Sequence, residues 1–368
     1  MSPPEFRPAL ELCGDFFRQV VKPILDNELP ALKYGAALIG PGSEVYGFDT
    51  EMSMDHDWGL RVFLFLTDED ASQGDAITEL LGNKLPTTWE GFPGAIETLT
   101  TTSTVRQMED DKATRPLKHH VTPITLGKFC LAQLAYDFTA RPPTAAEWLS
   151  IPSHALREMV CGAVYHDATG QIALLRRTLA WYPRDVYLYM LAAGCQRIGQ
   201  ESHLMPRAGY AGSELGSAII ASRLVRDIMN LCFLLEKQYA PYAKWFGAGF
   251  SRLECGSELE PLLLTAQTAA TWQARQDALV QCYDVVTKIL VKELGLEGKV
   301  PATSVPFHDR PWLIMPSEQL VEAIVQLIQD PDVLRIAERT MVGSIIQWTD
   351  NTDMENMAKD GILRLYEA

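Results

Sequence analysis

The chain reads Gly42-Ser43-Glu44-Val45-Tyr46-Gly47-Phe48-Asp49-Thr50-Glu51-Met52-Ser53-Met54-Asp55-His56-Asp57 between two apolar runs. The first run is Ala36-Ala37-Leu38-Ile39, and the second is Val62-Phe63-Leu64-Phe65-Leu66. Short apolar runs bounded by Gly or Pro are typical of buried strands. The sequence therefore predicts that this stretch leaves one strand, crosses a loop and enters a second strand.

Two acids stand at the end of the stretch. Asp55 and Asp57 are two residues apart where the second strand is predicted to start, so the pleat puts both carboxylates on one face. Neighbouring carboxylates repel unless a cation lies between them, and Mg²⁺ prefers one or two carboxylates together with substrate phosphates. At the other end, Gly42 and Ser43 offer backbone N–H groups and a hydroxyl that suit a phosphate oxygen.

This arrangement of Gly-Ser, a loop and Asp-x-Asp resembles the signature of the polymerase-β-like nucleotidyltransferase superfamily, and more narrowly the DUF4037 family. Three later segments look like that family's helical half and C-terminal part: Trp181-Tyr182-Pro183-Arg184-Asp185-Val186, Tyr239-Ala240-Pro241-Tyr242-Ala243-Lys244-Trp245 and Pro306-Phe307-His308-Asp309-Arg310-Pro311. The resemblance implies a small sheet domain that binds a nucleoside triphosphate with Mg²⁺ through Asp55 and Asp57.

The resemblance also implies a third carboxylate on a neighbouring strand. Glu97 lies in the strand-like segment 95–100 and is the candidate, which would make Asp55, Asp57 and Glu97 the catalytic set. The other location is the predicted strand 119–125, which carries no acid. Two hypotheses therefore stay open: an active nucleotidyltransferase, or an inactive nucleotide-binding protein of the same fold.

The remaining charges near the stretch have simpler interpretations. Glu44, Asp49 and Glu51 are interpreted as solvated loop acids rather than ligands. Arg61 shares the face of the paired aspartates if the strand is regular, and pairing with an acid is favoured over phosphate binding.

Two basic residues of the second half are candidates for nucleotide binding. Arg223 and Lys244 suit phosphate oxygens, as a planar fork and a point charge respectively. The alternative for Arg223 is an ion pair with Glu236 or Asp227. Lys244 is preferred because its surroundings are part of the resemblance.

Composition restricts the class of partner. The chain has 368 residues, which indicates two domains, and its formal net charge of −15 disfavours a polyanion as the main partner. Seven scattered cysteines without a C-x-x-C pair indicate reduced thiols. No secretory leader or membrane-length apolar run is found, so we expect a cytoplasmic protein without membrane contact.

The predicted fold class is α+β. Residues 1–145 are predicted to form a small mixed-sheet, nucleotidyltransferase-like domain, with helices over 10–25 and 74–85. Residues 146–368 are predicted to form an all-helical domain that closes a cleft. Within it, 155–165 is predicted as helix and 166–170 as a turn.

The expected function is Mg²⁺-dependent transfer of a nucleoside monophosphate from a nucleoside triphosphate to a hydroxyl or similar group of a small molecule, with release of pyrophosphate. Gly42 and Ser43 would hold the triphosphate. Modification of RNA or tRNA is less favoured because of the acidic charge. The sequence leaves open the acceptor, the base and the oligomeric state.

Overall fold

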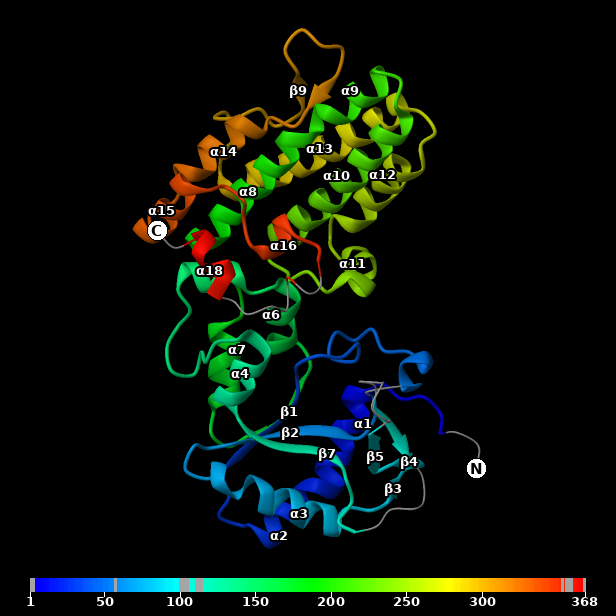
Figure 1. Ribbon diagram of the computed structural model, residues 1–368, viewed down its shortest axis with the longest axis vertical. Coiled ribbons are helices and arrows are strands. Elements are labelled where there is room, and N and C mark those ends of the chain that lie inside the picture. The colour runs from blue at the N-terminus through cyan, green and yellow to red at the C-terminus, as the bar shows by residue number, and fades with distance from the viewer. Residues whose placement is uncertain are drawn as a thin grey trace. The chain divides into compact units, whose positions relative to one another are not determined.

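The computed structural model of the chain describes residues 4–55, 58–98, 106–109, 115–351, 354 and 360–366. The chain forms two compact units. The first consists of Met1–Pro142 and Ala155–Ala180, and the second of Pro143–His154 and Trp181–Ala368. The first unit mixes helices with a sheet and the second is mainly helical, so the α+β class is confirmed (Figure 1).

A four-stranded mixed sheet forms the centre of the first unit. Its strand order is β7 (His120–Thr125), β2 (Arg61–Leu66), β1 (Tyr34–Leu38) and β8 (Ala163–Asp167). β1 is antiparallel to β2 and to β8, whereas β2 and β7 are parallel. Consequently β2, β7 and β8 run in one direction and β1 runs in the other. The predicted strands at 36–39, 62–66 and 119–125 are confirmed, and β7 is an edge strand, as Pro123 indicated.

Helices cover both faces of this sheet. Alternate side chains of β2 point to opposite faces, and the apolar ones pack against helices on each. Val62, Leu64 and Leu66 belong to one buried cluster with the N-terminal helices. On the opposite face, the rings of Phe63 and Phe65 lie 4.8 and 5.2 Å from Phe129 of α4 (Leu126–Leu134). A strand that is apolar on both faces needs cover on both, which explains its unbroken apolar sequence.

The N-terminal helical segment runs from residue 9 to 28. It consists of α1 (Ala9–Phe16), a π-helical turn η1 (Phe17–Val21) and α2 (Lys22–Glu28). Pro23 lies in the first turn of α2, where its missing N–H is tolerated, and the irregular turn comes directly before it. The predicted helix over 10–25 is thus confirmed, and it is locally distorted near Pro23.

The remaining elements of the first unit are short. They are η2 (Glu51–Asp55), η3 (Ala71–Gln73), α3 (Gly74–Lys84), β3 (Thr88–Trp89), β4 (Phe92–Pro93), β5 (Ala95–Thr98), β6 (Arg106–Glu109), α6 (Ser153–Val160) and α7 (Gln171–Thr178). β3 pairs with β4 and β5 with β6, each as a separate two-stranded sheet. The helix predicted over 74–85 is confirmed as α3.

The segment 155–180 differs from the sequence prediction. The helix predicted over 155–165 ends at Val160, and the turn predicted over 166–170 begins inside β8. Gly162 reverses the chain with a φ of +74°, after which β8 pairs with β1. The prediction is wrong here because β8 is a short edge strand whose pairing partner lies more than 100 residues earlier. The segment therefore packs with the first unit, although the sequence assigned it to the second domain.

The second unit is built on long helices. Its elements are α5 (Ala145–Ser150), α8 (Arg184–Ser202), α9 (Leu204–Tyr210), α10 (Glu214–Leu235), α11 (Ala243–Phe250), α12 (Gly256–Thr268), α13 (Trp272–Leu294), β9 (Val305–Pro306), β10 (Leu313–Ile314), α14 (Ser317–Val325), α15 (Pro331–Arg339), α16 (Ile345–Trp348) and α18 (Asp360–Tyr366). The β9–β10 ladder corrects the all-helical prediction. Over the described part of the chain, no helix combines the length and apolar character needed to cross a membrane.

Candidate functional site

The loop between β1 and β2 starts with two glycines in conformations that other residues rarely adopt. Gly40 has a φ of +93° and Gly42 a φ of +145°. A Cβ atom on Gly42 would lie 2.5 Å from the Glu44 carboxylate and 2.6 Å from the Arg61 guanidinium. Position 42 therefore favours glycine for its conformation, and a Cβ there would displace the ends of the Glu44 and Arg61 side chains. The side chains of Glu44 and Arg61 occupy the space beside Gly42, where the sequence analysis predicted a phosphate oxygen.

Glu44 and Arg61 form a buried ion pair beneath this turn. The Glu44 side chain is only 3% exposed, and the Arg61 guanidinium donates to its carboxylate and, at 2.8 Å, to the carbonyl of Pro41. Burial raises the pKa of Glu44, and the positive charge of Arg61 opposes that shift. The pairing predicted for Arg61 is confirmed, whereas the interpretation of Glu44 as a solvated acid is wrong.

Asp49 fixes the middle of the loop. Its Oδ2 accepts hydrogen bonds from the backbone N–H of Ala9, at 2.8 Å, and from the indole Nε1 of Trp58, at 3.1 Å. It therefore ties the loop to the start of α1 and to the residues before β2. The solvated interpretation is wrong for Asp49 and confirmed for Glu51, which is exposed.

A contact between two hydroxyls brings the two ends of the stretch together. Ser43 Oγ lies 3.4 Å from Ser53 Oγ, and Ser53 Oγ also accepts from the backbone N–H of Thr50 at 3.1 Å. Ser53 belongs to η2, the 3₁₀ turn that ends at Asp55. The Gly-Ser turn and the acidic turn are thus neighbours, although ten residues separate the two serines.

The backbone around Asp55 differs from the sequence prediction. Asp55 ends a 3₁₀ turn and β2 begins only at Arg61, after a bend at Gly59 with a φ of +122°. The argument from strand alternation therefore does not apply to Asp55 and Asp57. The side chain of Asp55 and residues 56–57 lie outside the described part of the chain, so the shared-face prediction stays a prediction.

Two strands are candidates for the third acid, β7 and β5. β7 is the strand parallel to β2, and its residues 120–125 include no acid. Glu97 lies in β5, where it pairs with Gln107 of β6 in a separate ladder. Its side chain lies outside the described part, so the structure leaves its distance from Asp55 undetermined.

The structure adds a buried carboxyl that the sequence analysis missed. Glu158 of α6 is 8% exposed and accepts a 2.8 Å hydrogen bond from the hydroxyl of Tyr46, in the middle of the loop. The backbone carbonyl of Glu158 accepts from Gly40 N–H at 2.8 Å, and the Arg157 guanidinium lies 5.6 Å from the Tyr46 ring. Burial raises the pKa of Glu158 to about 7. No local pattern marks this residue, because the contact depends on the unpredicted return of segment 155–180.

Arg223 and Lys244 belong to the second unit. Arg223 Nε donates to both carboxylate oxygens of Glu201, at 3.0 and 2.8 Å. Arg223 therefore forms an ion pair, as the alternative predicted, but its partner is Glu201 and not Glu236 or Asp227. Lys244 is exposed, and its ammonium lies 4.8 Å from the ring centre of Trp245. Lys244 therefore keeps an accessible charge, whereas that of Arg223 is engaged with Glu201.

The side chains that the structure describes do not by themselves form a metal site. Among the side chains that the structure describes, no group of three or more His, Cys, Asp or Glu residues is arranged to hold a metal ion. The side chains at 55, 57 and 97 are not among them. Near η2 the available donors are oxygens, from Ser43, Ser53 and the Asp55 segment, and oxygen is the donor that Mg²⁺ prefers.

The sequence comparison points to one family. Residues 148–246 match the model of a family described as Domain of unknown function (DUF4037). The DUF4037 match begins in α5 and ends in α11, so it includes two of the three later segments that carry the resemblance, 181–186 and 239–245. The loop 42–57 lies outside it. Searches of curated proteins and of solved structures gave no match.

Proposed function

We propose that the first unit binds a nucleoside triphosphate with Mg²⁺ at the β1–β2 loop and transfers the nucleoside monophosphate to a small acceptor. The observation that carries this proposal is the 3.4 Å contact between Ser43 Oγ and Ser53 Oγ. It brings the Gly-Ser turn, suited to phosphate oxygens, next to the turn that ends at Asp55, suited to a hard cation.

Contacts within the first unit hold the loop in place. The Glu44–Arg61 pair supports its first turn, Asp49 its middle, and the Tyr46–Glu158 hydrogen bond joins it to α6. Phosphoryl transfer depends mainly on positioning and on electrostatic stabilisation, so a fixed loop is the kind of support that such a reaction needs.

In this proposal each candidate residue has a distinct role. Ser43 would donate its hydroxyl to a phosphate oxygen, and Asp55 and Asp57 would hold Mg²⁺. When bound, the cation would neutralise charge on the phosphates and on the leaving group. Gly42 would contribute by conformation, because the Glu44–Arg61 pair occupies the space beside it.

The net charge of −15 favours a small acceptor over RNA, because a polyanion would be repelled over most of the surface. A second candidate function is nucleotide binding without turnover. It is favoured by one observation, the absence of an acid on β7, the strand parallel to β2.

Pyrophosphate release tests the two candidates together. The protein is incubated with each labelled nucleoside triphosphate, Mg²⁺ and a cell extract separated into small-molecule and RNA fractions. The proposal predicts release only with the small-molecule fraction. Tight nucleotide binding without release in any fraction would establish the binding protein, and release that requires the RNA fraction would contradict the small acceptor.

A further inference from the structure

A cavity of the first unit lies at the end of β2 away from the candidate site. It encloses about 410 Å³, which is within the usual range for a small-molecule pocket. Its lining includes Leu66, the last residue of β2, whereas the candidate loop leads into the first residue, Arg61. The inference drawn from it is therefore independent of the proposed function.

The strand directions explain why a cavity forms there. Leu66, Thr125 and Asp167 end β2, β7 and β8, and these three strands run in the same direction. After β7 the chain enters α4 at Leu126, and after β8 it turns into α7 at Gln171. Segments that diverge from the carboxyl ends of neighbouring strands commonly leave a crevice in which ligands bind.

The walls of the cavity combine apolar and polar surface in similar proportions. Leu66, Leu126, Phe138 and Leu175 line it, and each is at most 6% exposed. Leu174 lines it as well but is 58% exposed, so an apolar surface continues outward from the cavity. These apolar side chains suit a ligand with an aliphatic or aromatic body.

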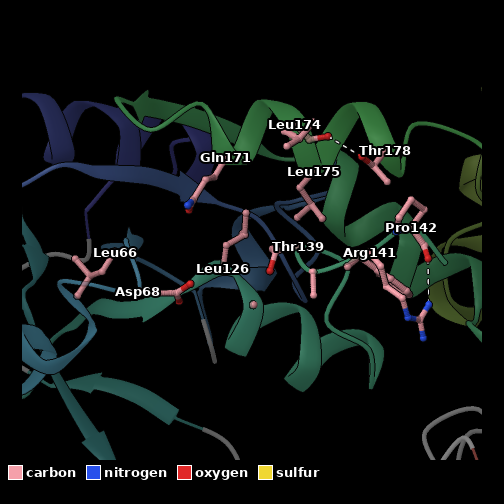
Figure 2. Close-up of a pocket in the computed structure, with 13 residues that line it drawn as sticks. Leu66, Asp68, Leu126, Thr139, Arg141, Pro142, Gln171, Leu174, Leu175 and Thr178 are labelled. Carbon is pink, nitrogen blue, oxygen red and sulfur yellow. Dashed lines mark hydrogen bonds between the residues drawn. The ribbon is translucent and has the colours of Figure 1, made fainter.

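The cavity lining includes one acid, Asp68, and one base, Arg141. Asp68 is exposed, and within the described part of the chain its carboxylate has no hydrogen-bond or ion-pair partner. In Figure 2 this carboxylate and the amide of Gln171 both point toward the interior of the cavity. The guanidinium of Arg141 lies on the other side, where it donates to the carbonyl of Pro142 at 3.0 Å.

Two further aspartates near the cavity are already engaged. Asp137 accepts from the backbone N–H and the hydroxyl of Thr139, and Asp167 accepts from the backbone N–H of Ala173 at 2.9 Å. They satisfy local backbone groups and add negative charge to this end of the sheet. Asp68 is thus the carboxylate that remains for a ligand.

We propose that this cavity binds a small organic amine, with its ammonium group at Asp68 and its apolar body against Leu126 and Leu175. The Gln171 amide supplies a further hydrogen bond to a polar substituent of the ligand. A protonated amine matches both the carboxylate and the acidic surface, whereas an organic acid would meet repulsion.

Calorimetric titration of the full chain with three probes of one size tests this assignment. The probes are n-hexylamine, 1-hexanol and hexanoate. The parent should bind hexylamine about fivefold more tightly than hexanol, since a solvent-accessible ion pair contributes at most about that factor. Hexanoate should bind most weakly.

Matched variants assign the binding to this cavity. Asp68→Asn should reduce hexylamine affinity to that of hexanol, and Glu69→Gln, which removes the neighbouring charge outside the cavity lining, should change neither affinity. Ala140→Trp places a large ring at an exposed lining position and should abolish binding of both probes. The proposal is overturned if no probe binds, if hexanol or hexanoate binds as tightly as hexylamine, or if Ala140→Trp retains binding.

Discussion

At the scale of single residues, buried carboxyls hold the β1–β2 loop. Glu44 is stabilised by the guanidinium of Arg61, whereas Glu158 accepts a hydrogen bond from the Tyr46 hydroxyl. A hydroxyl compensates a buried negative charge less well than a guanidinium does. The two acids therefore support the same loop in different ways, and Glu158 is expected to titrate near neutral pH.

The Glu158→Gln variant should change the pH dependence of stability. Burial raises the pKa of Glu158 from 4.5 to about 7 in the folded chain. The folded state therefore favours the protonated form, whose stabilising contribution is complete below pH 4.5 and disappears as the pH rises through about 7. Over that interval the parent should lose up to about 3 kcal/mol that the variant keeps.

Urea denaturation of both proteins at pH 5 and pH 8 measures this difference. Glutamine keeps an oxygen that can accept from Tyr46 but cannot ionise. The expected result is a variant that gains stability relative to the parent at pH 8. Equal pH dependence of the two proteins would mean that Glu158 does not titrate between these values in the folded chain.

At the scale of elements, the sequence predicts those that depend on local pattern. β1, β2 and α3 are apolar or amphipathic over their own length, and Pro123 correctly marks β7 as an edge strand. β8 was missed because its strand character comes from pairing with β1 rather than from its own residues. Glu158 was missed with it, since α6 reaches the loop only through that pairing.

A pair of glycine variants tests the close approach at the start of β8. Gly162 and Gly170 have nearly equal φ values, +74° and +71°. A Cβ on Gly162 would overlap the carbonyl oxygen of Leu38, whereas one on Gly170 would meet nothing within 4 Å. Gly162→Ala should therefore destabilise the chain by several kcal/mol, and Gly170→Ala by about 1 kcal/mol from backbone strain alone.

Thermal denaturation compares the two glycine variants under one condition. A loss for Gly162→Ala no larger than that for Gly170→Ala would contradict the packing of segment 155–180 against β1. Gly170 has nearly the same backbone conformation as Gly162 but open space around its Cβ position. The difference in stability between the two variants therefore measures the close contact between position 162 and the Leu38 carbonyl.

At the scale of the whole molecule, the chain crosses between the units three times. The composition and length predicted two domains, but residues 155–180 return to the first unit after residues 143–154 belong to the second. A boundary near residue 145 follows from the composition change at 139–143. The sequence holds no comparable signal at 180, because residues 155–180 join the first unit through the pairing of β8 with the distant strand β1.

Two N-terminal fragments test this organisation. Fragment 1–180 contains β8 and should melt cooperatively, whereas fragment 1–145 leaves one edge of β1 unpaired although this strand is fully buried in the chain. Unpaired buried backbone groups are costly and promote association. Circular dichroism during heating and light scattering measure both properties, and a monomeric, cooperatively melting fragment 1–145 would contradict the assignment.

The most direct test of the proposed nucleotide site is a melting experiment with Mg²⁺ and a non-hydrolysable nucleoside triphosphate. A ligand that binds only the folded state stabilises it by about 2.7 kcal/mol at a hundredfold excess over its dissociation constant. The parent and the Glu51→Gln control should gain melting temperature with both ligands together, and Asp55→Asn/Asp57→Asn should gain none while matching the parent in metal-free buffer. An equal gain in the double variant, or a double variant that melts far below the metal-free parent, would contradict a metal–nucleotide site at these aspartates.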